Sequence, residues 1–151
     1  MKIIVVMLLA LISLTATVSA QPLTVKVSPL KTVGQKTLVE LTMTNRGTNR
    51  IEAARAVCFV LDQNGQMVGQ AAKWVIGQNK TSLEPNGQAK FNFVITAPHP
   101  LMATNLTAKV SFSRLILQGG KQANPQNNVA IIPPTLEQEN RSNAVITLPK
   151  K

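Results

Sequence analysis

The stretch Ala53–Gly65, AARAVCFVLDQNG, decides the fold class. Its first nine residues are apolar on both parities apart from Arg55, which is typical of a strand in the middle of a sheet with both faces partly covered. Asn64-Gly65 at its end is the strongest short-range signal for a β-hairpin, because both residues tolerate positive φ. The sequence therefore predicts a central strand, a tight turn and a return strand from about Gln66.

Apolar and polar side chains alternate in four further segments, residues 23–28, 39–44, 89–96 and 106–112. This period of two is the signal of half-buried strands. Residues that favour turns lie between the segments. We expect the inward parity of these strands and of the central strand to form the core: Val25, Val39, Leu41, Val60, Phe91, Phe93, Val110 and Phe112.

Strands at this spacing, without crossover helices, predict an all-β fold, an antiparallel immunoglobulin-like β-sandwich of about seven strands over residues 21–120. The alternation slips after Phe112, so we expect a β-bulge near Ser113. The segment 121–151 is rich in Pro and Asn. It is expected to form an extended tail or to add edge strands.

The first 20 residues have the order of a secretory signal peptide: Lys2, then the apolar run Ile3–Leu14, then the small-residue site Val18-Ser19-Ala20. The run is shorter than the roughly 20 residues that a membrane-spanning helix needs, and no later segment is apolar enough to span one. We expect cleavage after Ala20, a mature chain that begins at Gln21, and a periplasmic or extracellular location.

Motifs between Ala54 and Phe93 resemble the FxLYD-type immunoglobulin-like domain of exported bacterial proteins, over about half of the mature chain. The matching pieces are the strand 57–62 that ends in Asp, Gly65, the start of the return strand 67–69, the turn 83–87 with Phe91 after it, and the upstream strand 39–45 that ends in Asn. Cys58 stands in place of the family's Phe, Leu61 in place of its Tyr, and Asn86 interrupts its Pro-Gly pair. The resemblance implies a fold and no catalytic residue.

Without Lys2, 15 basic residues face 6 acidic ones, which gives the mature chain a net charge of +9. Such a balance favours anionic partners, although the Lys and Arg residues occur singly and predict a solvated surface. Aromatic residues are too few for a base-stacking platform, so no nucleic acid is expected. The partner is expected to be a macromolecule, either a protein or an anionic polymer of the cell envelope.

No arrangement of residues predicts catalysis or a cofactor. His99 with Met102 could be half of a copper site, but a metal needs more converging ligands, and a solvated loop is the preferred interpretation. The acidic residues occupy turn-like positions, the polar side of a strand or the tail, which does not favour a catalytic pair. They are Glu40, Glu52, Asp62, Glu84, Glu137 and Glu139.

Cys58 is the only cysteine, so no intramolecular disulfide can form. We expect it to be buried and inert in a monomer. Trp74 is expected to pack between the sheets, on one parity with Val68, Ala72 and Ile76; the alternative is an outward platform for a sugar or peptide. Three glycosylation sequons, at Asn79, Asn105 and Asn140, are interpreted as coincidence in an Asn-rich chain.

The sequence thus predicts an exported, non-enzymatic binding or structural module that meets another macromolecule through a sheet edge or a basic face. The alternative is a basic adaptor that attaches to anionic envelope polymers or lipids. A metal carrier or a small hydrolase is a remote alternative.

Overall fold

The computed structural model describes residues 21–78 and 81–134. Five of the predictions lie wholly or partly outside these ranges. They concern the signal peptide 1–20, the sequon at 79–81, the acidic residues Glu137 and Glu139, the sequon at Asn140, and the part of the tail after residue 134.

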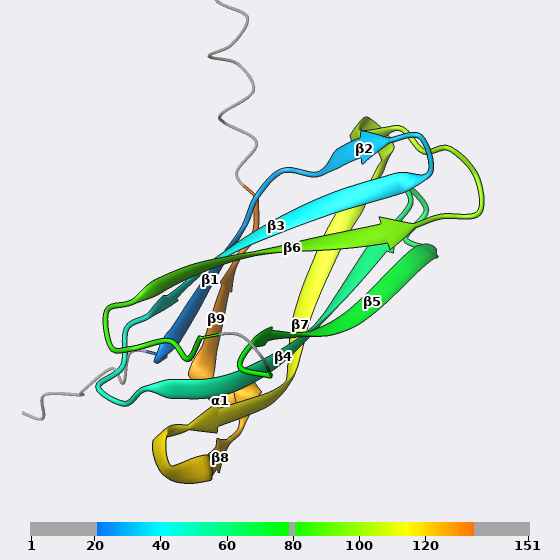
Figure 1. Ribbon diagram of the computed structural model, residues 1–151. Coiled ribbons are helices and arrows are strands. Elements are labelled where there is room, and N and C mark those ends of the chain that lie inside the picture. The colour runs from blue at the N-terminus through cyan, green and yellow to red at the C-terminus, as the bar shows by residue number, and fades with distance from the viewer. Residues whose placement is uncertain (1–20, 79–80, 135–151) are drawn as a thin grey trace, which may run out of the picture.

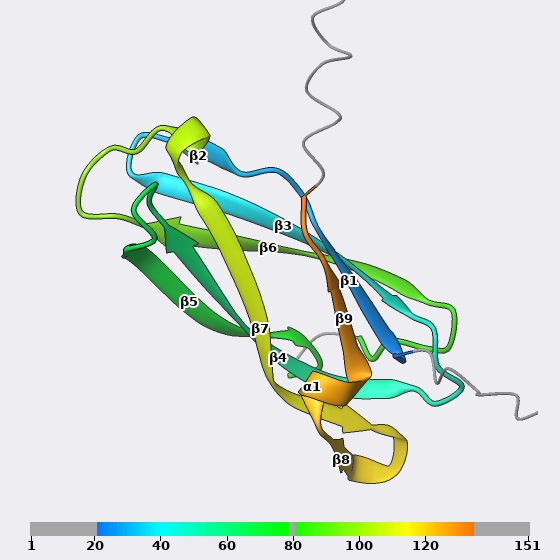
Figure 2. The same ribbon diagram turned by 180° about the vertical axis from the view of Figure 1, so that it is seen from behind.

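Two sheets pack face to face, as Figures 1 and 2 show from opposite sides. Sheet A contains β1 (Leu23–Val27), β2 (Lys31–Val33), β3 (Lys36–Asn45), β6 (Gln88–Thr96) and β9 (Val129–Ile132). Sheet B has the order β5 (Met67–Ile76), β4 (Ile51–Leu61), β7 (Thr107–Leu117) and β8 (Lys121–Ala123). Three short helical segments lie in the connections: η1 (Ala103–Asn105), η2 (Gln118–Gly120) and α1 (Pro125–Asn128).

The predicted β-sandwich is confirmed. In sheet A the central strand β3 pairs antiparallel with β1, β2 and β6, whereas β1 pairs parallel with β9. Every pair of sheet B is antiparallel. The described ranges contain nine strands, more than the seven or so that were expected. Three of them, β2, β8 and β9, are short pieces of three to four residues.

The core follows the predicted parity. Five of the eight expected core residues, Val25, Val39, Leu41, Val60 and Phe93, are at most 1% exposed. The other three, Phe91, Val110 and Phe112, are half-buried and pack against the same cluster. The rings of Phe91 and Phe93 meet edge to face with centroids 5.0 Å apart.

The hairpin and the bulge are both confirmed. Gly65 has φ of 76°, and the Asp62 carboxylate accepts hydrogen bonds from the backbone N–H groups of Asn64 and Gln66, at 2.8 and 2.9 Å. On the other side of β4, Arg55 pairs with Arg114 and the next residue, Ala56, with Phe112. Ser113 is therefore the extra residue of a bulge in β7.

A fully buried asparagine, Asn45, joins the end of β3 to two turns. Its side-chain Nδ2 donates to the carbonyl oxygens of Asn49 and Leu83 at 2.9 and 3.0 Å, and its Oδ1 accepts from the Gly47 N–H at 2.9 Å. All of these polar groups are thereby satisfied, as burial requires. The expected turn 83–87 is held here as well, because the Asn86 N–H donates to the Asn45 carbonyl at 2.8 Å.

The end of the described chain changes sheets. Strand β8 pairs with β7 in sheet B, the single helical turn α1 follows, and β9 pairs with β1 in sheet A (Figure 2). Asn124 caps α1, because its Oδ1 accepts from the Gln126 N–H at 3.0 Å, and Pro125 occupies the first position of the turn. The segment 121–132, which the sequence leaves open between tail and edge strands, thus forms two short edge strands.

Candidate functional site

The first candidate site is the pair of long edge strands β5 and β6. In the described part of the chain β5 pairs only with β4, and β6 only with β3. The two strands are ten and nine residues long and contain no proline. An edge of this kind carries backbone N–H and C=O groups that can pair with another strand. We call β5 and β6 the free edges.

The free edges lie on the same side of the sandwich and approach each other closely (Figure 1). A Cβ atom on Gly69 of β5 would lie only 2.6 Å from Cγ2 of Ile95 in β6. Glycine at this position therefore allows the two sheets to close on this side.

The second candidate site is the outer face of sheet B. Because Ala56, Cys58 and Val60 of β4 are buried, the residues of opposite parity point outward. Strand pairing places them in four rows across β5, β4 and β7, which we call the basic face: Trp74–Arg55–Arg114, Ala72–Val57–Ser111, Gln70–Phe59–Lys109 and Met67–Leu61–Thr107.

Trp74 belongs to this face, so the prediction that it packs between the sheets is wrong. It pairs with the exposed Arg55, is half-buried, and is not part of the core cluster. The reason is an irregularity in β5: Ala54 pairs with Ile76 but Arg55 pairs with Trp74, which leaves Val75 as an extra residue. The expected single parity from Val68 to Ile76 is broken there.

The cations of the basic face have no carboxylate within ion-pair distance in the described part of the chain. Arg55, Arg114 and Lys109 are exposed, and none of them forms a described ion pair. Arg55 and Arg114 lie directly opposite each other on neighbouring strands, which is an unfavourable position for like charges. Sequence analysis missed this row; Arg55, the one charge in the apolar run, was its only local signal.

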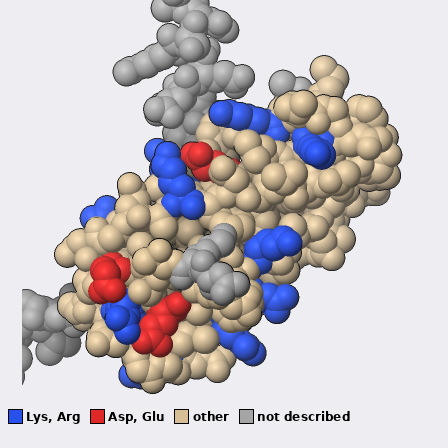
Figure 3. All heavy atoms as spheres, viewed as in Figure 1, with Lys and Arg blue, Asp and Glu red and all other residues tan. Residues whose placement is uncertain are grey.

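Sheet A differs from the basic face in that one of its cations, Lys90, has an acidic partner. Figure 3 shows the side of the molecule on which sheet A is nearer the viewer, and Lys and Arg are spread singly there among uncharged atoms. Lys90 of β6 lies 3.8 Å from the carboxylate of Glu40 in β3. The expectation of dispersed, solvated charges therefore fits this side.

The remaining acidic side chains hold turns together. The Glu52 carboxylate accepts from Arg50 at 3.2 Å and from the N–H groups of Gly119 and Gly120 at 3.1 Å each. These hydrogen bonds, that from Arg50 foremost, hold the pKa of Glu52 below its ordinary value of 4.5. Glu84 lies 3.9 Å from Arg50, and Asp62 binds its own turn.

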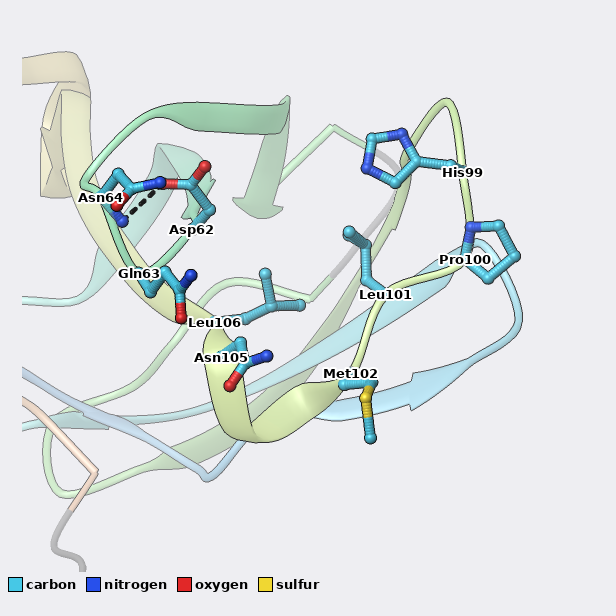
Figure 4. A pocket seen from close by; sticks show the side chains of 9 residues that line it. All are labelled: Asp62, Gln63, Asn64, His99, Pro100, Leu101, Met102, Asn105 and Leu106. Atoms are coloured by element: carbon cyan, nitrogen blue, oxygen red, sulfur yellow. Dashed lines mark hydrogen bonds between the residues drawn. The ribbon is translucent and has the colours of Figure 1, made fainter.

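A shallow hollow of about 260 Å³ lies between the β4–β5 turn and the loop 99–106 (Figure 4). His99 and Met102 both line it, but their side chains point in different directions, with Leu101 between them. In the two described ranges, no group of three or more His, Cys, Asp and Glu residues is placed to hold a metal ion. The hollow therefore does not bring together the copper ligands that were considered.

Cys58 is buried at the centre of sheet B, as expected. Burial raises the pKa of its thiol from 9.0 to about 11, so the reactive thiolate is disfavoured at neutral pH. Among the described residues, no helix is long and apolar enough to cross a membrane.

No family model and no curated protein matches the chain. Among solved structures the chain is similar to the Northeast Structural Genomics Consortium target SoR45, with a TM-score of 0.48, 13% identity, and coverage of 86% of this chain and 94% of that one. It is also similar to a Bordetella pertussis protein described as "Putative ApaA Protein", with a TM-score of 0.48, 15% identity, and coverage of 75% and 88%. A third similar structure, a β-glucuronidase from glycoside hydrolase family 2, has a TM-score of 0.43 and 13% identity; the match covers 73% of this chain and 12% of that chain.

Proposed function

We propose that this chain is an exported, non-enzymatic binding module that takes up an extended strand of a partner protein along a free edge. The observation that carries the proposal is the contrast in edge length. The free edges run for ten and nine residues without proline. The outer side of β7 is unpaired only over residues 107–114, because β8 covers the rest, and the edge pieces β2, β8 and β9 have three to four residues.

Strand addition uses main-chain hydrogen bonds for affinity and the alternate side chains for specificity. Long edges without such a partner are an aggregation hazard, and proteins commonly shorten, bulge or charge them. Each free edge has only one lysine, Lys73 in β5 and Lys90 in β6.

Two further observations support the proposal. The described carboxylates take part in turn and surface contacts, which fits a module without catalysis. Export is supported by the signal pattern of residues 1–20 and by the resemblance to the FxLYD-type domains of exported bacterial proteins.

The test places a lysine on a free edge and compares it with a lysine inside the same sheet. Ala72→Lys in β5 and Val94→Lys in β6 add a charge at exposed edge positions. Val57→Lys is the matched control, because Val57 lies in the same outward row as Ala72 but on β4, which is paired on both sides at this position. Each purified variant is cross-linked in envelope extract of the source organism, and captured proteins are compared.

A partner that the wild type and Val57→Lys capture, and that one edge variant loses, supports strand addition. Hydrogen exchange of the complex should then show new protection of backbone amides along that edge. A partner that both edge variants retain would contradict the proposal, as would one lost only in Val57→Lys.

A further inference from the structure

We infer that the basic face of sheet B docks on an anionic phospholipid membrane. This inference concerns the outer face of the sheet and does not depend on strand addition at the free edges. It rests on the charges of the face, on its apolar side chains and on the spacing of its cations.

The cations of the basic face are available to bind an external anion. Arg55 and Arg114 are held opposite each other, and Lys109 lies two rows further along β7, without a described carboxylate within ion-pair distance of any of them. The described acidic residues lie elsewhere: Glu40 on sheet A, Glu52 and Glu84 around Arg50, and Asp62 in the hairpin turn. Phosphate groups suit guanidinium pairs, because Arg can bind them through two parallel hydrogen bonds.

Apolar side chains lie between these cations. Val57, Phe59 and Leu61 form an outward column along β4 and are half-buried, and Met67 at the end of the face is 55% exposed. Trp74 stands in the row of the two arginines. Tryptophan is the side chain that favours the interface between lipid and water, because it has an apolar body and a polar N–H group.

The spacing of the cations favours a membrane over an acidic protein. Outward side chains of a sheet stand on a broad surface, with successive rows about 7 Å apart. The arginine row and Lys109 are therefore separated by about 13 Å along the strands. A protein partner would need carboxylates at matching places, whereas an anionic bilayer offers negative charge everywhere on a plane.

The protein contains its own reporter for the test, because Trp74 is its only tryptophan. The mature chain is titrated with vesicles of equimolar phosphatidylglycerol and phosphatidylcholine, and with vesicles of phosphatidylcholine alone. We expect a blue shift of the Trp74 emission with the anionic vesicles only, weakening as salt is added.

Charge-matched variants locate the binding to one face. Arg55→Gln/Arg114→Gln should bind anionic vesicles about 30-fold more weakly, from the usual contribution of a basic residue near such a membrane. The control Lys26→Gln/Lys36→Gln removes the same charge from exposed positions on the outer face of sheet A. That face is further from the membrane than a Debye length of about 8–10 Å, so the control should change binding by less than about threefold. Equal losses in the two variants would overturn the inference.

Two polymers test the other classes of partner. Poly-L-glutamate presents carboxylates on a polypeptide, and polygalacturonate presents them on a glycan. Absence of binding to the anionic vesicles would overturn the inference, whether or not either polymer binds.

Ala72→Lys separates the two proposals, because it should block strand addition at β5 while adding a cation to the basic face. Its binding to anionic vesicles should be equal to or stronger than that of the wild type.

Discussion

The two sides of the sandwich are held together by different forces. On the open side, β5 and β6 meet through apolar contacts such as that of Gly69 with Ile95, and Phe93 fills the interior. On the closed side, the chain passes from β8 through α1 to β9, and polar contacts fix it: the Asn124 cap and the Glu52 carboxylate bound to Gly119 and Gly120. The long edges can therefore stay unpaired because burial of their inner side chains stabilises them. The short pieces β8 and β9 bury only Ala123 and Val129 against the core, and hydrogen bonds fix the turns beside them.

The largest effect should come from the open side. Phe93→Ala in β6 should lower the free energy of unfolding by about 3–5 kcal/mol, the usual cost of truncating a buried Phe. Lys90→Ala, on the outward parity of the same strand, should change it by less than about 1 kcal/mol, since an exposed ion pair contributes little. Urea unfolding of both variants measures the difference. Similar values would mean that the inner side chains do not stabilise this edge.

The Cys58 thiol reports on the strand next to the open edge, because Cys58 in β4 pairs with Ala71 in β5. Its pKa is about 11 in the folded protein against 9.0 ordinarily, so the unfolded chain loses this proton first as pH rises. The stabilisation is fully present below pH 9 and is lost as pH rises through about 11, for a total of at most about 3 kcal/mol. Cys58→Ala should not show this part of the pH dependence.

Thiol labelling gives a second measurement on Cys58. At neutral pH the native protein should react with a thiol reagent only after denaturant is added, and it should run as a monomer on a non-reducing gel. Rapid labelling of the native protein would show that β5 detaches easily, and the open side would then be the weaker one.

A smaller effect is expected from the cap on the closed side. Asn124→Ala removes the hydrogen bond to the Gln126 N–H, and loss of such a cap costs about 1 kcal/mol. Backbone amides of β9 should exchange faster with solvent, while those of β6 remain protected. If the amides of β6 and β9 lost protection together, the two sides would form one cooperative unit.

The smallest effect concerns Glu52, which binds the η2 turn. Because the folded state lowers its pKa, the stabilisation is present above the ordinary value of 4.5 and is lost as pH falls through the lower folded pKa. Glu52→Gln should remove this acid dependence and shift the amide signals of Gly119 and Gly120 in NMR spectra. Glu40→Gln on sheet A serves as the control and should leave both signals in place.

The sequence predicted the features that depend on local chemistry. The hairpin after Leu61 follows from its turn residues, and the Ser113 bulge from the slip in alternation. Trp74 was misplaced because its orientation depends on how β5 pairs with β4, which spacing along one strand does not reveal. The arginine row was not predicted for the same reason, since Arg55 and Arg114 are 59 positions apart in the numbering and meet only through strand pairing.

The parallel pairing of β1 with β9 has a mechanical consequence. Both strands run in the same direction, with Leu23 opposite Val129 at their starts and Lys26 opposite Ile132 at their ends. The chain therefore enters the pair at one end of the sandwich and leaves it at the other. Tension applied between residues 21 and 134 would pull the two strands past each other and strain all of their hydrogen bonds at once. Such shear resists rupture better than peeling, in which the bonds break one after another.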